Sequence, residues 1–144
     1  MEVSAVRQRV KRVLAEAKRP EAERRAARRA INDQAAIEFD ELLRHIAIPM
    51  FRQVADILRA EGCAVDLFTP GGSVRLMSER NLDDYIEVAL DTSGAAPRLL
   101  GRASRSRGGN VAQTELVLNA TADIAALTEE DLLGFLLSEI EGLV

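Results

Sequence analysis

The fold is decided by residues 98–118, which read RLLGRASRSRGGNVAQTELVL. The pair Gly108-Gly109 suits the two-residue turn of a β-hairpin, because the central positions of such turns favour a positive φ. A turn at this pair predicts the register of the flanking strands. It places Leu99 opposite Leu118, Gly101 opposite Leu116 and Ala103 opposite Thr114 on one face, with Leu100 opposite Val117 and Arg102 opposite Glu115 on the other. These pairs are complementary, so the stretch predicts an antiparallel hairpin.

The segment before this hairpin has the period of a half-buried sheet. Apolar and polar residues alternate over residues 63–68, 74–76 and 85–91, which predicts three strands. Turn residues separate the first two strands at 69–73, and a loop precedes the hairpin at 92–97. The sequence therefore predicts a five-stranded antiparallel meander over residues 63–118.

The first 61 residues have the period of amphipathic helices. Pro20 ends one helical pattern over residues 3–18 and suits the first turn of a second helix. That second helix covers residues 20–61, is interrupted near Pro49 and stops at Gly62. Residues 1–19 are therefore expected to form a basic amphipathic arm, and residues 20–144 a single α+β domain.

A last helix is predicted over residues 128–143. It opens on Thr128-Glu129-Glu130-Asp131, a capping box in which aspartate replaces the usual glutamate. Its apolar residues share one face, so we expect it to pack on one face of the sheet. The predicted class is α+β, with helices at both ends of the chain and an antiparallel sheet between them.

Charge is unevenly distributed along the chain. The first 30 residues carry ten cations and four anions, whereas the other 114 carry nine cations and nineteen anions. Such a split indicates a basic segment for an acidic partner, whether a nucleic acid, an anionic lipid, another protein or the acidic part of a second copy of the chain.

Composition excludes several classes of protein. One cysteine, Cys63, and one histidine, His45, cannot supply an intramolecular disulfide or the usual Cys/His zinc sites. No apolar run has the length of a membrane-spanning helix or of a secretory signal, so we expect a cytoplasmic protein. Arginine outnumbers lysine 17 to 2, which favours a GC-rich coding background and a bacterial origin.

Enzymatic chemistry has no sequence signature in this chain. His45 and Cys63 lack an evident catalytic partner, and the glycine pairs lack the flanking residues of a phosphate-binding loop. The acidic clusters at 83–87 and 129–131 lack the spacing of a calcium loop. We therefore expect no catalytic, cofactor-binding or metal-binding residues.

The predicted function is that of a non-enzymatic protein-binding module or accessory factor that acts as a homodimer. The expected partner interface is a stripe of valines at spacings of three and four, formed by Val3, Val6, Val10 and Val13. The stripe lacks the Trp, Phe and Leu anchors of a membrane-surface helix, so no membrane partner is expected.

Two alternatives remain open. A nucleic-acid-associated factor would use the basic helices and the hairpin, through Arg24, Arg25, Arg28, Arg29, Arg105 and Arg107. Only five aromatic residues and a pI near 5.1 weigh against this reading. The other alternative is a small acidic chaperone-like protein. In size and charge the chain resembles type III secretion chaperones, but it lacks a predicted helix between the third and fourth strands.

Overall fold

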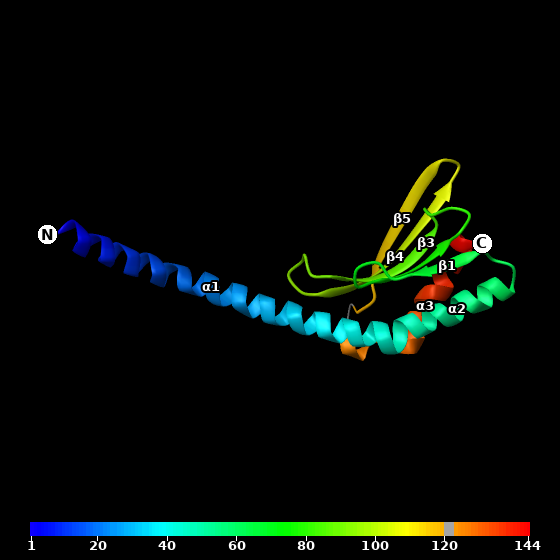
Figure 1. Ribbon diagram of the computed structural model, residues 1–144, viewed down its shortest axis with the longest axis horizontal. Helices are drawn as coiled ribbons and strands as arrows, with labels where there is room; N and C mark the ends of the chain where they lie inside the picture. The colour runs from blue at the N-terminus through cyan, green and yellow to red at the C-terminus, as the bar shows by residue number, and fades with distance from the viewer. Residues whose placement is uncertain (120–122) are drawn as a thin grey trace. The chain divides into compact units, whose positions relative to one another are not determined.

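The computed structural model describes residues 1–119 and 123–144 and has the predicted α+β class (Figure 1). Its helical elements before the sheet are α1 (Val3–Leu42), the π-helical turn η1 (Leu43–Ala47) and α2 (Ile48–Ala60). The strands are β1 (Val65–Phe68), β2 (Val74–Ser78), β3 (Tyr85–Asp91), β4 (Arg98–Arg107) and β5 (Asn110–Val117). The chain closes with η2 (Ile124–Ala126), α3 (Glu129–Glu139) and η3 (Ile140–Leu143).

The chain divides into two units, residues 1–34 and residues 35–144. The first unit is the N-terminal part of α1 alone. The second contains the C-terminal turns of α1 and all later elements. Its core includes Ala35, Phe39 and Leu42 from those turns, which agrees with the expectation that the later part of the helix faces the core.

The helix break predicted at Pro20 is wrong, because α1 continues through this residue. Proline lacks the N–H that would donate to the carbonyl of Glu16. Residues 16–20 are exposed, so water can bind that carbonyl and the helix loses one bond rather than its continuity. Helix α1 therefore accommodates Pro20, and no helix begins at this residue.

The interruption predicted near Pro49 is confirmed. The α-helical pattern ends at Leu42, and the N–H of Ile48 donates to the carbonyl of Leu43, five residues back. Helix α2 then begins with Pro49 in its first turn, a position that proline favours.

The sheet is a meander with strand order β1-β2-β3-β4-β5. In the hairpin the observed pairs include Leu100 with Val117, Gly101 with Leu116, Arg102 with Glu115 and Ala103 with Thr114. The N–H of Leu118 donates to the carbonyl of Leu99 at 2.8 Å, which completes the predicted register. Gly108 and Gly109 have φ values of 58° and 85°, as the predicted turn requires.

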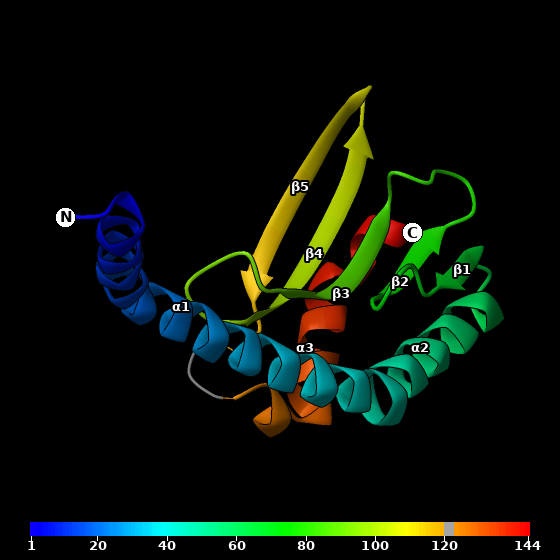
Figure 2. The same cartoon turned by 60° about the vertical axis from the view of Figure 1, so that its left-hand side comes forward.

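One face of the sheet is covered by α2 and α3, and residues of both helices join the strands in a single core (Figure 2). Helix α3 approaches β4 closely at Gly101, where a Cβ atom would lie 2.6 Å from Cζ of Phe135. The C-terminal helix therefore packs on one sheet face, as predicted, and glycine at 101 makes room for its ring.

The predicted capping box opens α3. The N–H of Asp131 donates to Oγ1 of Thr128 at 3.2 Å, and the N–H of Thr128 donates to Oδ2 of Asp131 at 3.0 Å. The backbone N–H of Thr128, followed by its side chain, holds the pKa of Asp131 below its ordinary value. The predicted helix over 128–143 is observed as α3 followed by the 3₁₀ turn η3.

Candidate protein-interaction surfaces

The valine stripe lies on the first unit and is exposed. The exposed fractions of Val3, Val6, Val10 and Val13 are 76%, 43%, 51% and 68%. This unit is part of one helix, so it holds no second element against which the stripe could pack. The stripe is therefore an apolar surface that only a contact outside this unit can cover.

The same unit carries most of the positive charge of the chain. Residues 1–34 hold ten cations and five anions, a net charge of +5, whereas residues 35–144 hold nine cations and eighteen anions, a net charge of −9. The arginines at 24, 25, 28 and 29 are exposed, and Arg25 pairs with Glu21 at 2.6 Å. An exposed pair of this kind contributes about 0 to 1 kcal/mol, so it leaves the basic character of the helix in place.

The two hairpin arginines lie in different surroundings. Arg105 reaches the C-terminal segment, where its Nη2 is 3.6 Å from Oε2 of Glu139 and its side chain lies against Gly142. Arg107 is exposed and flanks the Gly108-Gly109 turn. Both belong to the second unit, whereas the four arginines at 24–29 belong to the first.

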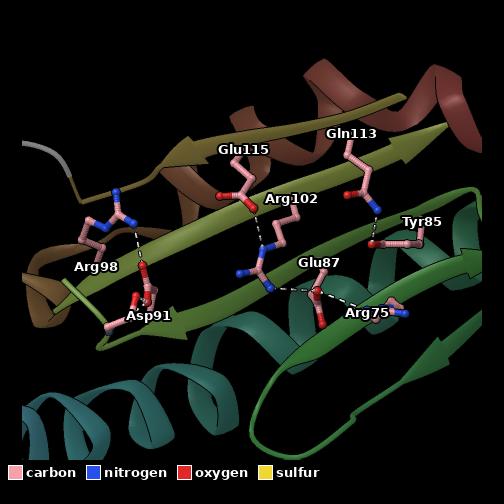
Figure 3. Close-up of polar contacts among 9 residues, drawn as sticks. Arg75, Tyr85, Glu87, Asp91, Arg98, Arg102, Gln113 and Glu115 are labelled. Carbon is pink, nitrogen blue, oxygen red and sulfur yellow. Dashed lines mark hydrogen bonds and ion pairs between the residues drawn. The ribbon is translucent and has the colours of Figure 1, made fainter. Parts of the chain in front are cut away.

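The sheet face opposite the helices carries a row of alternating charges, which we call the charge row. It runs across four strands through Arg75, Glu87, Arg102 and Glu115, each directly opposite the next (Figure 3). Successive N–O distances along the row are 3.3, 3.7 and 3.3 Å. The hairpin turn alone predicts the last pair, Arg102 with Glu115. The other pairs of the row depend on the pairing of β2 with β3 and of β3 with β4.

Glu87 is the buried centre of the charge row. Its side chain is 7% exposed and accepts hydrogen bonds from Oγ of Ser73 at 3.0 Å and from Arg75 at 3.3 Å. The guanidinium of Arg75 also lies over the ring of Tyr85, 4.0 Å from its centroid. The carboxylate is thus compensated by cations on both sides, which is what burial of a charge requires.

A further side-chain hydrogen bond lies on the same face of the sheet, beside the charge row. Tyr85 on β3 and Gln113 on β5 flank Ser104 on β4, and Nε2 of Gln113 donates to the hydroxyl of Tyr85 at 3.3 Å (Figure 3). This bond spans the middle strand at Ser104, whose hydroxyl is buried without a hydrogen-bond partner among the described residues. Nε of Arg75 is likewise buried without a hydrogen-bond partner there, whereas the other named side chains of this face bind one another.

Asp91 is the last residue of β3 and lies opposite Arg98 of β4. The hydroxyl of Ser93 and then the guanidinium of Arg98 bind its carboxylate and hold its pKa well below the ordinary value. Because the folded-state pKa is depressed, the resulting stability is present above the ordinary aspartate pKa and is lost as pH falls toward the folded-state value.

We therefore expect Asp91→Asn to lower the melting temperature at neutral pH and to have a smaller effect in acid. Thermal melts of both chains at a series of pH values from neutral to strongly acidic would measure this. A difference between the two chains that does not change over that range would contradict the assignment.

His45 and Cys63, the two residues with potential catalytic chemistry, each line a pocket. His45 borders one of about 200 Å³ with Glu38 and Glu41, and Cys63 borders one of about 310 Å³ with Arg80 and Asp84. Within residues 1–119 and 123–144, no three or more His, Cys, Asp or Glu side chains form a group that could hold a metal ion. In the same described part of the chain, no helix is both long and apolar enough to cross a membrane.

Fold and surfaces together define an α+β domain preceded by a basic helical unit with an uncovered apolar stripe. No protein-family model matches the chain, and searches of curated proteins and of solved structures give no match either. Its function must therefore be argued from its own surfaces.

Proposed function

We propose that this protein is a non-enzymatic protein-binding module that acts as a homodimer. Its partner interface contains Val3, Val6, Val10 and Val13. The observation that carries this proposal is the exposure of that stripe on a unit made of one helix. Helices in proteins gain most of their stability by packing an apolar face, so the stripe has most to gain from a partner.

The charge distribution supports a second copy of the chain as the partner. The first unit has a net charge of +5 and residues 35–144 have −9, so the basic helix of one copy complements the acidic unit of another. Valine burial supplies the main driving force, because each exposed ion pair adds only about 0 to 1 kcal/mol. Cytoplasmic location and bacterial origin remain predictions from the sequence.

The stripe is tested by the double substitution Val6→Asp with Val13→Asp in the full-length chain. Placing two carboxylates in an apolar interface should raise the dimer dissociation constant at least about tenfold, which corresponds to about 1.4 kcal/mol. Sedimentation velocity over a series of protein concentrations measures the constant.

The matched control is Gln8→Asp with Ala15→Asp, which introduces the same two side chains on the opposite side of the helix. The control should dimerise like the unaltered chain. Equal dissociation constants for the stripe variant and the control would exclude the stripe as the interface. An unaltered chain that stays monomeric at every concentration would exclude the homodimer.

A nucleic-acid-associated factor is the second candidate, and the observation that favours it is the exposed group Arg24, Arg25, Arg28 and Arg29. Phosphate contacts of this kind release counterions, so affinity for a labelled DNA duplex should fall steeply between about 50 and 200 mM salt. A salt-resistant dimer with no affinity for the duplex would favour protein binding over this candidate.

A further inference from the structure

Strand β5 ends the sheet with an open edge. It pairs with β4 on one side, and among the described residues of the second unit no strand pairs with its other side. All residues from Asn110 to Leu116 are exposed. A strand edge of this kind presents a row of unpaired backbone donors and acceptors.

The hydrogen bond from Leu118 to Leu99 shows which backbone groups face outward. In an antiparallel pair the bonding direction alternates along the strand, so residues 112, 114 and 116 bond to β4 as Leu118 does. The N–H and C=O groups of Val111, Gln113, Glu115 and Val117 therefore point away from the sheet.

The opposite edge of the sheet is protected, and β5 is not. Strand β1 has only four residues, and the carbonyl of its Val65 accepts a hydrogen bond from Nε of Arg59 at 3.0 Å. Strand β5 has eight residues, contains no proline or lysine, and pairs with β4 in an unbroken register without a bulge. Its one charged side chain, Glu115, pairs with Arg102, and β5 otherwise lacks the charges, prolines and bulges that keep a strand from pairing with another chain.

We propose that β5 pairs antiparallel with β5 of a second copy. Thr114 lies opposite Thr114 of that copy on the two-fold axis, and the two sheets join into one. The pairing would form about eight backbone hydrogen bonds through the four outward-facing residues of each strand. This contact uses no residue of the first unit, so it goes beyond the valine stripe.

The side chains of β5 select this register. On the face of the charge row, Val111 meets Val117 of the second copy and Gln113 meets Glu115. On the other face, Ala112 meets Leu116 and threonine meets threonine. Every apolar residue has an apolar partner, and no two like charges are opposed.

Neighbouring registers are less favourable. Outward groups alternate, so the strand can shift only in steps that keep odd-numbered residues opposite odd-numbered residues. One such shift sets Glu115 against Glu115 of the second copy, which opposes like charges. The shift in the other direction sets Val111 against Glu115 and Asn110 against Leu116, which mismatches apolar and polar side chains.

The pairing also extends the charge row across the dimer. Glu115 accepts from Arg102 within its own sheet, and its second oxygen faces the partner strand's amide at position 113. Gln113 has two amide hydrogens and uses one for Tyr85, so the other can reach that carboxylate.

The experiment is disulfide trapping in full-length chains that carry Cys63→Ala. Thr114→Cys would place two thiols directly opposite one another at a non-hydrogen-bonded pair, with Cα atoms about 4.5 Å apart, within the range of a disulfide. Under mild oxidation we expect most of this variant to run as a covalent dimer on a non-reducing gel.

Ala112→Cys is the matched control, because it lies on the same face and is also exposed. Its two copies would be offset by four residues, about 13 Å along the strand, and should not cross-link. An equal mixture of Ala112→Cys and Leu116→Cys chains should cross-link to each other, because these positions are opposed.

Equal cross-linking of Thr114→Cys and Ala112→Cys would overturn the proposal, and so would the absence of cross-links in both and in the mixture. If no disulfide-linked dimer forms while the chain still sediments as a dimer, the strand contact is overturned and the valine stripe remains the candidate interface. Retained trapping in the Val6→Asp with Val13→Asp chain would show that the strand contact forms without the stripe.

Discussion

Replacing Gly101 with alanine is expected to lower the free energy of unfolding by about 2 to 3 kcal/mol, the upper part of the range for overpacked cores. The added Cβ would lie 2.6 to 3.0 Å from three atoms of the Phe135 ring. That ring is buried in the core between α3 and the sheet, so it cannot swing into solvent to relieve the overlap. Either the ring leaves its position or α3 moves away from β4. Urea unfolding, with equal slopes for both chains, would measure the loss.

Gly134→Ala is the matched control, since it makes the same change one residue away from the same ring. Gly134 is exposed within α3, and no atom lies within 4 Å of where its Cβ would be. Alanine favours a helix interior by about 1 kcal/mol over glycine, so this variant should be more stable than the unaltered chain. Two glycine-to-alanine changes with effects of the same sign would contradict the packing described between α3 and β4.

Glu87→Gln is expected to lower the free energy of unfolding by about 2 kcal/mol, below the 3 to 5 kcal/mol typical of a broken buried ion pair. Glutamine keeps the shape and can still accept from Ser73, but it removes the negative charge that faces Arg75 and Arg102. Both arginines are partly exposed, at 28% and 38%, so water compensates some of the loss. Chemical unfolding at neutral pH would measure the effect.

Glu115→Gln provides the comparison within the same charge row. It removes the same charge from the other side of Arg102, at a side chain that is 56% exposed. The expected loss is about 0 to 1 kcal/mol, because water screens an exposed pair. Similar losses for both glutamates would mean that burial does not determine the contribution of charges on this face.

Local signals were sufficient for the hairpin, the capping box and the interruption near Pro49. In each case neighbouring residues contain the deciding chemistry: two glycines with positive φ, a threonine three residues before an aspartate, and a proline after an apolar turn. Pro20 shows the limit of such signals. Whether proline ends a helix or is accommodated within it depends on the surroundings of the freed carbonyl, and the same residue type is compatible with both outcomes.

Residues close together in the chain are sufficient to predict the α+β class, the five strands, the hairpin register and the uneven charge, but not the continuity of α1 through Pro20. Three contacts follow from tertiary packing alone: Glu87 is buried between Arg75 and Arg102, Phe135 lies on Gly101, and Tyr85 reaches Gln113 across β4. Tyr85 and Gln113 are 28 residues apart, and Gly101 and Phe135 are 34 apart. Their meeting depends on how strands and helices pack along their whole lengths, and no local pattern encodes that packing.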